Sequence, residues 1–216
     1  MINYLYFLLF LLSFHLNVYT QVHSHHHHQH DGLHHWEIPS KDPDRIILTF
    51  NGDPSSKRAV TWRTDSSVKQ AEAQIAIASV NSKFVTQATT YNAFTEEFDL
   101  GLYKSNKSLV VNYHSVVFEN LNPNTLYAYR VGYEDNWSEW IQFKTANNSY
   151  SPTQFVYFGD AQNDILNHWS RVIRMAYQTA PNASFVIHAG DLVDNAHKDF
   201  EWAQWFKAGG FIHSQW

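Results

Sequence analysis

Short runs rich in β-branched and aromatic residues, with turn residues between them, dominate the middle of the chain. Residues 45–50, 58–64, 71–78, 110–118, 126–133 and 139–145 read as strands, and in the second of them Val60 and Trp62 share one face. Short strands at this spacing predict a β-sandwich. Between them, 79–108 is ambiguous: 83–90 is a candidate for pairing, and 99–108 resembles a loop.

A different pattern begins after the polar stretch 147–152, which ends in Pro152 and predicts a domain boundary. A strand ends before Gly159, a helix begins at a cap, Asn163 or Asp164, and runs to Thr179, and a second strand covers 184–189. The apolar face predicted for this helix comprises Ile165, Trp169, Val172, Ile173 and Ala176. A second helix is predicted at 198–207, with its aromatic residues in the core or an interface. The order strand, helix, strand predicts a parallel α/β unit.

Each of the two strands after the boundary is followed closely by Gly-Asp. Asp160 and Asp191 are 31 positions apart, about the length of one βαβ unit. Because parallel strands end at the same edge of a sheet, we expect both carboxylates in one crevice. Their mutual repulsion would be offset by a pair of divalent or trivalent metal ions, which carboxylate oxygens bridge in sites that clamp phosphate. Gln162 and Asp194 add nearby oxygen donors that are candidate ligands, although each alone is more typical of a loop contact.

The N-terminus combines a short apolar run with a histidine-rich tract. The apolar run 2–14 is too short to span a bilayer comfortably and predicts a secretory signal peptide over 1–20, with an uncleaved anchor as the alternative. Eight of the 14 histidines lie in 23–35, within a predicted linker over 21–40. This tract would capture Zn²⁺, Cu²⁺ or Ni²⁺, or it is a solvated arm. We expect a secreted or periplasmic protein with no membrane segment in its mature form.

Composition narrows the classes of function. The net charge is −5 and no cluster of Lys and Arg is present, so nucleic acid is not an expected partner. The chain has no cysteine, which excludes disulfides, thiolate ligands and a cysteine nucleophile. Its 216 residues suffice for one large or two small domains.

Several phrases in the chain point to a known family. The corner 120–125, followed by Tyr127 and Tyr129, resembles the fibronectin type III pattern. The phrases 59–64, 114–132 and 137–145, followed by the linker and two strand-Gly-Asp units, resemble the purple acid phosphatases and their relatives among the calcineurin-like metallophosphoesterases. The resemblance implies a fibronectin type III-like domain over 41–147 and a metallophosphoesterase domain that begins at 153 and runs to the end of the chain at 216.

The resemblance also implies a dinuclear centre of Fe, Mn or Zn that hydrolyses small phosphate esters. Asp160 matches the aspartate that binds one metal, and Asp191 matches the aspartate that bridges both. Asp194 stands where the purple enzymes have tyrosine. The charge-transfer colour of those enzymes comes from the tyrosinate, so we expect no such colour here, and the preference for Fe³⁺ loses its support. Gln162 stands where many relatives have histidine, and its amide oxygen would suit Mn²⁺, Mg²⁺ or Fe.

Neither the Gly-Asn-His motif of that family nor its later histidine motifs occur in these residues. We therefore expect the proton donor to lie beyond residue 216, so that no catalytic residue is assigned here, and we expect the 216 residues to be inactive alone. A parallel sheet of only two strands, with one face open, also predicts a piece of a longer protein. The alternative is a non-catalytic secreted β-sandwich with a metal-capturing histidine-rich arm.

Overall fold

The computed structural model describes residues 34–102 and 108–216. The predicted signal peptide and most of the histidine-rich tract lie outside the described residues. Residues 33–216 cluster as one compact unit. Within the described residues, no helix is long and apolar enough to cross a membrane.

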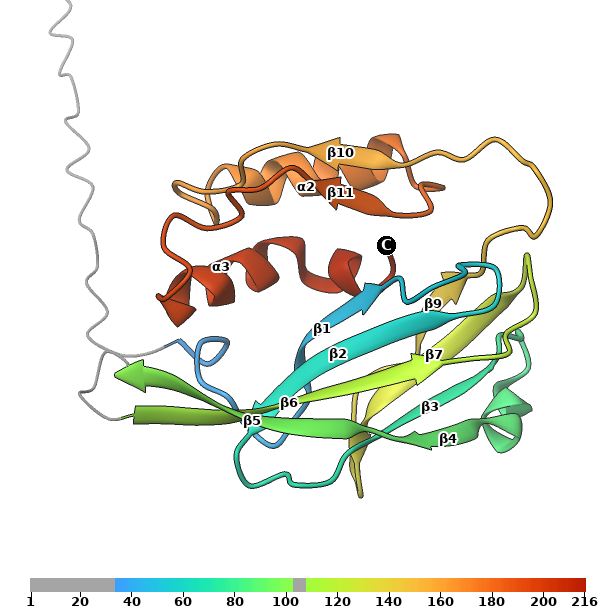
Figure 1. The fold of residues 1–216 in the computed structure, drawn as a ribbon, viewed down its shortest axis with the longest axis horizontal. Coiled ribbons are helices and arrows are strands. Elements are labelled where there is room, and N and C mark those ends of the chain that lie inside the picture. The colour runs from blue at the N-terminus through green and yellow to red at the C-terminus, as the bar shows by residue number, and fades with distance from the viewer. Residues whose placement is uncertain (1–33, 103–107) are drawn as a thin grey trace, which may run out of the picture. The chain divides into compact units, whose positions relative to one another are not determined.

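Two antiparallel sheets form the predicted sandwich (Figure 1). The first has the order β1-β2-β6-β5, and the second has the order β4-β3-β7-β8 with β9 also paired to β7. Their bounds are β1 Asp44–Thr49, β2 Arg58–Asp65, β3 Glu72–Ile77, β4 Thr89–Asn92, β5 Phe94–Leu102, β6 Ser108–Phe118, β7 Leu126–Tyr133, β8 Asn136–Trp137 and β9 Ile141–Lys144.

Alternating side chains from both sheets fill the core of the sandwich. Val60, Trp62, Phe118, Tyr129 and Val131 are all at most 1% exposed. Val60 and Trp62 share the buried face of β2, as predicted from their spacing. Each of these side chains removes its apolar surface from water, so the two sheets are held together mainly by the hydrophobic effect.

The ambiguous region 79–108 is where the prediction was least accurate. The segment 83–90 does not form one strand, because Ser82–Gln87 is a 3-10 helix capped by Asn81 and only the last residues belong to β4. The predicted loop at 99–108 is also partly wrong, since β5 continues to Leu102 and β6 begins at Ser108. Phe94 and Phe98 on β5 are exposed, so this edge strand lacks the alternation of buried and exposed residues by which a strand is predicted from sequence.

The corner between β6 and β7 confirms the resemblance to a tyrosine corner. The Tyr127 hydroxyl accepts a hydrogen bond of 2.8 Å from the backbone N–H of Asn122. Asn120 and Asn124 have φ angles of 57° and 51°, in the left-handed region where asparagine is one of the tolerated residues. The corner therefore reverses the chain tightly and ties β7 back to it.

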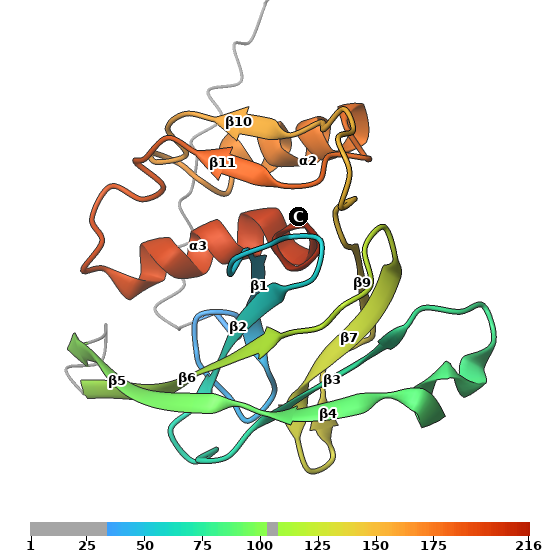
Figure 2. The same cartoon turned by 45° about the vertical axis from the view of Figure 1, so that its right-hand side comes forward.

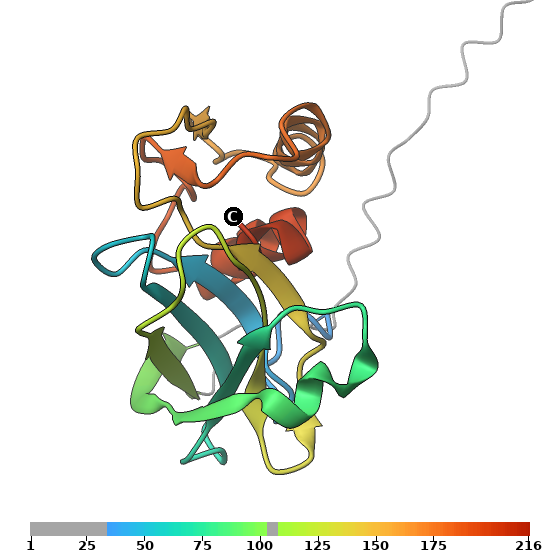
Figure 3. The same cartoon turned by 90° about the vertical axis from the view of Figure 1, so that its right-hand side faces the viewer.

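The C-terminal region holds the predicted parallel pair, β10 Val156–Phe158 and β11 Val186–His188, with helices α2 Trp169–Thr179 and α3 Asp199–Gly209 and the 3-10 helix η2 Gly210–Ser214. In all three views α3 lies between the sandwich and the β10–β11 pair (Figures 1, 2 and 3). A second apolar cluster fills this region, and Ile47 of β1 packs against it.

The first of these helices is shorter than predicted. Asn163 and Asp164 do not cap it, because both have positive φ angles, 66° and 57°, and form a turn instead. The helix begins at Trp169, and His168 occupies the cap position without a side-chain hydrogen bond. The apolar face was also partly wrong, since Val172 is 51% exposed while Trp169 and Ile173 are buried.

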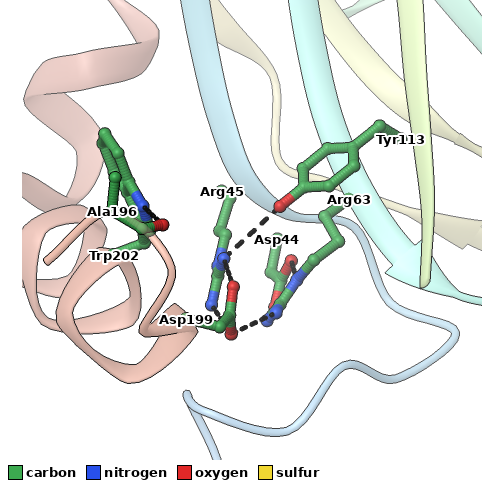
Figure 4. Close-up of polar contacts among 7 residues, drawn as sticks. All are labelled: Asp44, Arg45, Arg63, Tyr113, Ala196, Asp199 and Trp202. Carbon is green, nitrogen blue, oxygen red and sulfur yellow. Dashed lines mark hydrogen bonds and ion pairs between the residues drawn. The ribbon is translucent and has the colours of Figure 1, made fainter. Parts of the chain in front are cut away.

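Four side chains join the sandwich to helix α3 (Figure 4). Arg45 of β1 makes two hydrogen bonds to Asp199, with Nη1–Oδ1 and Nη2–Oδ2 distances of 2.6 and 2.7 Å. Arg63 of β2 lies with Nη1 3.6 Å from Asp199 Oδ2 and also pairs with Asp44. The side chains of Arg45, Arg63 and Asp199 are at most 4% exposed. This cluster places opposite charges in a region closed to water, where an unpaired charge would be costly.

Candidate functional site

The carboxyl ends of β10 and β11 form the candidate site. The strands are parallel, with Val156 paired to Val186 and Phe158 paired to His188. Asp160 follows β10 by two residues and Asp191 follows β11 by three, so both aspartates come directly after the same edge of the sheet. Open α/β sheets bind their ligands at this edge.

Hydrogen bonds tie the two loops at this edge to each other. The backbone carbonyl of Asp191 accepts from the N–H groups of Ala161 and Gln162, each at 3.0 Å. The Gln162 side chain donates from Nε2 to Asp191 Oδ2 at 3.2 Å. The loop after one strand therefore positions the aspartate that follows the other.

The turn at Asp191 has an unusual backbone conformation. Gly190 has a φ angle of 125°, which favours glycine, and Asp191 itself has a φ angle of 47°. Non-glycine residues with positive φ are uncommon, and aspartate is among those that adopt this conformation most readily. Such conformations persist where the surrounding structure holds them, and here the two hydrogen bonds to the Asp191 carbonyl do so.

The four predicted ligands are only partly brought together. Asp160 and Gln162 line one hollow of about 190 Å³, and Asp191 is joined to it through its hydrogen bond with Gln162. Asp194 is exposed and is not part of the hollow. Within residues 34–102 and 108–216 no group of three or more His, Cys, Asp or Glu side chains is placed to hold a metal ion. Of the four predicted ligands, two carboxylates and one amide are thus brought together at this edge.

One residue of the hollow was missed at the sequence level. His168 lines it beside Asp160, and its Nε2 lies 3.4 Å from Asp164 Oδ2. The two residues lie in the turn that precedes α2, so their contact is set by the loop and helical spacing does not predict it. The pair adds an imidazole and a carboxylate to the polar rim of the edge.

Aromatic side chains lie beneath this edge. Trp169 packs with ring centroids 5.9 Å from Phe158 and 5.8 Å from His188, and Trp205 stacks on Trp169 at 5.6 Å. Burial lowers the pKa of His188 below its ordinary value of 6.5. A neutral ring is therefore favoured there, and the charge at the edge is left to the exposed carboxylates.

Comparison with known proteins identifies the sandwich. Residues 43–145 match the family model described as the purple acid phosphatase N-terminal domain. The sandwich is therefore similar to the N-terminal domain of purple acid phosphatases. No curated protein matches the chain.

Solved structures extend the likeness to the fold of both regions. The structure of PhoD is similar with a TM-score of 0.50 and 14% identity, over 78% of this chain and 36% of PhoD. The sandwich alone is less than half of the chain, so this match includes residues of the C-terminal region. The FN1-FN3 domains of chicken CNTN1 match over 50% of this chain and 31% of theirs, with 19% identity and a TM-score of 0.33. The chain thus spans about a third of the length of these two proteins.

Proposed function

We propose that this chain is part of a metal-dependent phosphoesterase of the acid phosphatase type, in which Asp160 and Asp191 bind metal. The observation that carries the proposal is the parallel pairing of β10 and β11, after which both aspartates follow one edge. The match of 43–145 to a domain found in purple acid phosphatases supports it. The substrate class would be small phosphate esters, and the protein would act in a secreted or periplasmic location.

The described residues fit the beginning of a dinuclear site. Two carboxylates and an amide oxygen are hard donors, which suit Fe, Mn or a similar ion, although Zn also binds carboxylates. Such a pair of ions would lower the pKa of bound water and offset charge on a phosphoryl group. The part played by this chain is to present Asp160 and Asp191 from two joined loops, with Gln162 orienting the Asp191 carboxylate. Asp194 would contribute only from outside the hollow.

Binding of Mn²⁺ tests the assignment directly. A variant that lacks residues 23–35 serves as the background, because it removes the competing histidine-rich tract. In that background we expect Asp160→Asn and Asp191→Asn each to weaken Mn²⁺ binding by roughly tenfold or more, measured by calorimetry and by Mn²⁺ electron paramagnetic resonance. Asp135→Asn, an exposed carboxylate on the sandwich, is the matched control and should leave the affinity unchanged.

The outcome separates the two functions that the sequence left open. Equal Mn²⁺ binding by all three variants would remove the metal-site assignment. Loss of all metal binding on deletion of 23–35 would favour the secreted sandwich with a metal-capturing arm. Because the Gly-Asn-His motif and the later histidine motifs of the family do not occur in these residues, we expect no turnover of an aryl phosphate by the 216-residue chain with added Mn²⁺, Zn²⁺ or Fe. Sustained turnover that tracks the protein through purification would contradict this.

A further inference from the structure

A cavity of about 170 Å³ lies between the sandwich and the C-terminal region. Ile47 and Phe50 line it from the sandwich, and Ile173, Val186 and Ile212 line it from the C-terminal region. Its lining also includes Arg58, His188, Trp205 and His213. An apolar cavity with a few nitrogen-bearing side chains is the usual composition of a small-ligand site.

Three of the lining side chains carry a buried nitrogen atom with no hydrogen-bond partner among the described residues. These atoms are Arg58 Nε, His188 Nδ1 and Trp205 Nε1. Buried polar atoms in folded proteins nearly always have a partner, and leaving one unsatisfied is costly. Three such atoms around one cavity indicate that a ligand with acceptor atoms belongs there.

Arg58 contributes a positive charge that the protein does not neutralise. It is 3% exposed, its Nη2 donates to the Ser184 carbonyl at 3.2 Å, and its guanidinium carbon lies 3.9 Å from the Phe50 ring centroid. The buried Arg45 and Arg63 both pair with carboxylates, whereas no carboxylate pairs with Arg58 in the described part of the chain. Burial lowers its pKa to about 10. An uncompensated buried charge destabilises the fold unless an anion joins it.

We propose that this cavity binds a small oxyanion, held by the Arg58 guanidinium and the Trp205 indole N–H. One water molecule occupies about 30 Å³ in the liquid, so the cavity has room for an anion such as phosphate or acetate. The planar guanidinium matches the geometry of such oxygens. The ligand is therefore a phosphate, sulfate or carboxylate group and not a neutral apolar molecule.

A groove shares part of its lining with the cavity. Arg58, Phe50, Phe185 and Trp216 line both the cavity and a groove of about 810 Å³, whose rim includes Lys144. The groove is also lined by Thr153 and 181–184, which precede β10 and β11, whereas Asp160 and Asp191 follow these strands. The groove thus opens at the end of the strands opposite to Asp160 and Asp191, and none of the four predicted metal ligands lines the cavity, which reaches His188 at the carboxyl end of β11.

Thermal unfolding of the full chain in EDTA tests the proposal, because EDTA removes any metal that would bind phosphate. We expect inorganic phosphate to raise the Tm by roughly 3–5 °C for each tenfold increase above its Kd, at constant ionic strength set with sodium chloride. Sulfate and acetate should also raise the Tm. Chloride in place of the oxyanions should give no such rise.

Two variants and a matched control locate the effect. Arg58→Met should abolish the rise and, without phosphate, be at least as stable as the parent, since it removes an unpaired buried charge. Trp205→Phe should keep the ring packing and weaken phosphate binding by roughly tenfold. Lys57→Met removes an exposed charge at the neighbouring position and should behave as the parent.

The results decide the proposal in either direction. An unchanged phosphate response in Arg58→Met, or an equal loss in Lys57→Met, would overturn it. No response of the parent to any oxyanion would also overturn it. If Arg58→Met does not fold, Arg58→Lys provides the test, because it keeps the charge but loses Nε and the planar fork and should bind phosphate more weakly.

Discussion

His213 illustrates how the surroundings of a single side chain set its chemistry. It is 6% exposed, its ring stacks on Trp205 with centroids 3.9 Å apart, and its Nε2 lies 3.3 Å from the Trp205 carbonyl. Burial lowers its pKa from 6.5 to about 4, with a smaller contribution from His188. The neutral ring is thus the folded form over most of the acidic range.

This shift predicts a loss of stability in acid. The unfolded chain binds a proton at His213 near pH 6.5, whereas the folded chain does so only near pH 4, so stability falls as pH is lowered through that interval and then levels off. The contribution of this residue is roughly 3 kcal/mol. Thermal melts from pH 7 to pH 4 should show a shallower loss for His213→Phe. His168→Phe, which removes an exposed histidine, should follow the parent, and equal slopes for all three proteins would refute the account.

At the level of single residues, the sequence revealed some of the site but little of the charge network. Asp160 and Asp191 could be placed because each follows a Gly at the end of an apolar run. The bond from Gln162 to Asp191 depends on how two loops meet in space, which no local pattern encodes. Arg58 also looked like an ordinary strand residue, because its bond to the Ser184 carbonyl joins positions 126 apart and leaves no local signal.

At the level of elements, the strands that bury one face were predicted best. The bounds of β7, Leu126–Tyr133, agree with the prediction, because alternating residues of this strand lie in the core. The start of α2 was predicted too early. The helical spacing of apolar residues begins at Ile165, but residues 165–168 form a turn and the helix begins at Trp169. Periodicity reports which residues can share a face, but it does not report positive φ angles such as those of Asn163 and Asp164.

The hydrogen bond in the corner before β7 is predicted to contribute to stability. Tyr127→Phe removes the hydroxyl that accepts from the Asn122 N–H and leaves that donor without its partner. We expect a loss of about 1–2 kcal/mol in the free energy of unfolding, measured by urea denaturation. Tyr133→Phe, on the same strand, removes a hydroxyl that has no hydrogen-bond partner among the described residues and should cost much less. Equal losses in the two variants would contradict this role of the corner.

At the level of the compact unit, the sandwich and the C-terminal region are stabilised together. Asp199 pairs with Arg45 of the sandwich, and the Tyr129 hydroxyl donates to the Ser214 carbonyl at 2.7 Å. Both contacts are buried, and each joins the sandwich to the C-terminal region. We therefore expect 33–216 to unfold in a single cooperative transition.

Asp199→Asn tests this coupling. The change keeps the shape of the side chain but leaves two buried arginines with less negative charge, so we expect a loss of about 3–5 kcal/mol. Hydrogen exchange followed by mass spectrometry should show faster exchange in β7 as well as in α3. Glu119→Gln breaks the exposed pair with Lys57 and should cost less than about 1 kcal/mol. Faster exchange in α3 alone would show that the two regions unfold independently.

The pairing of Arg45 with Asp199 also has a consequence for synthesis on the ribosome. The two residues are 154 positions apart, so the first strand of the sandwich is made long before its carboxylate partner. At translation rates of about 5–20 residues per second, the delay is roughly 8–30 seconds. The last strand of the sandwich ends at Lys144, so all of its strands are made before Asp199, and Arg45 has no Asp199 beside it when they are complete. The nascent chain therefore carries Arg45 without its carboxylate partner until Asp199 is made, and the contact that joins the two regions can form only at the end of synthesis.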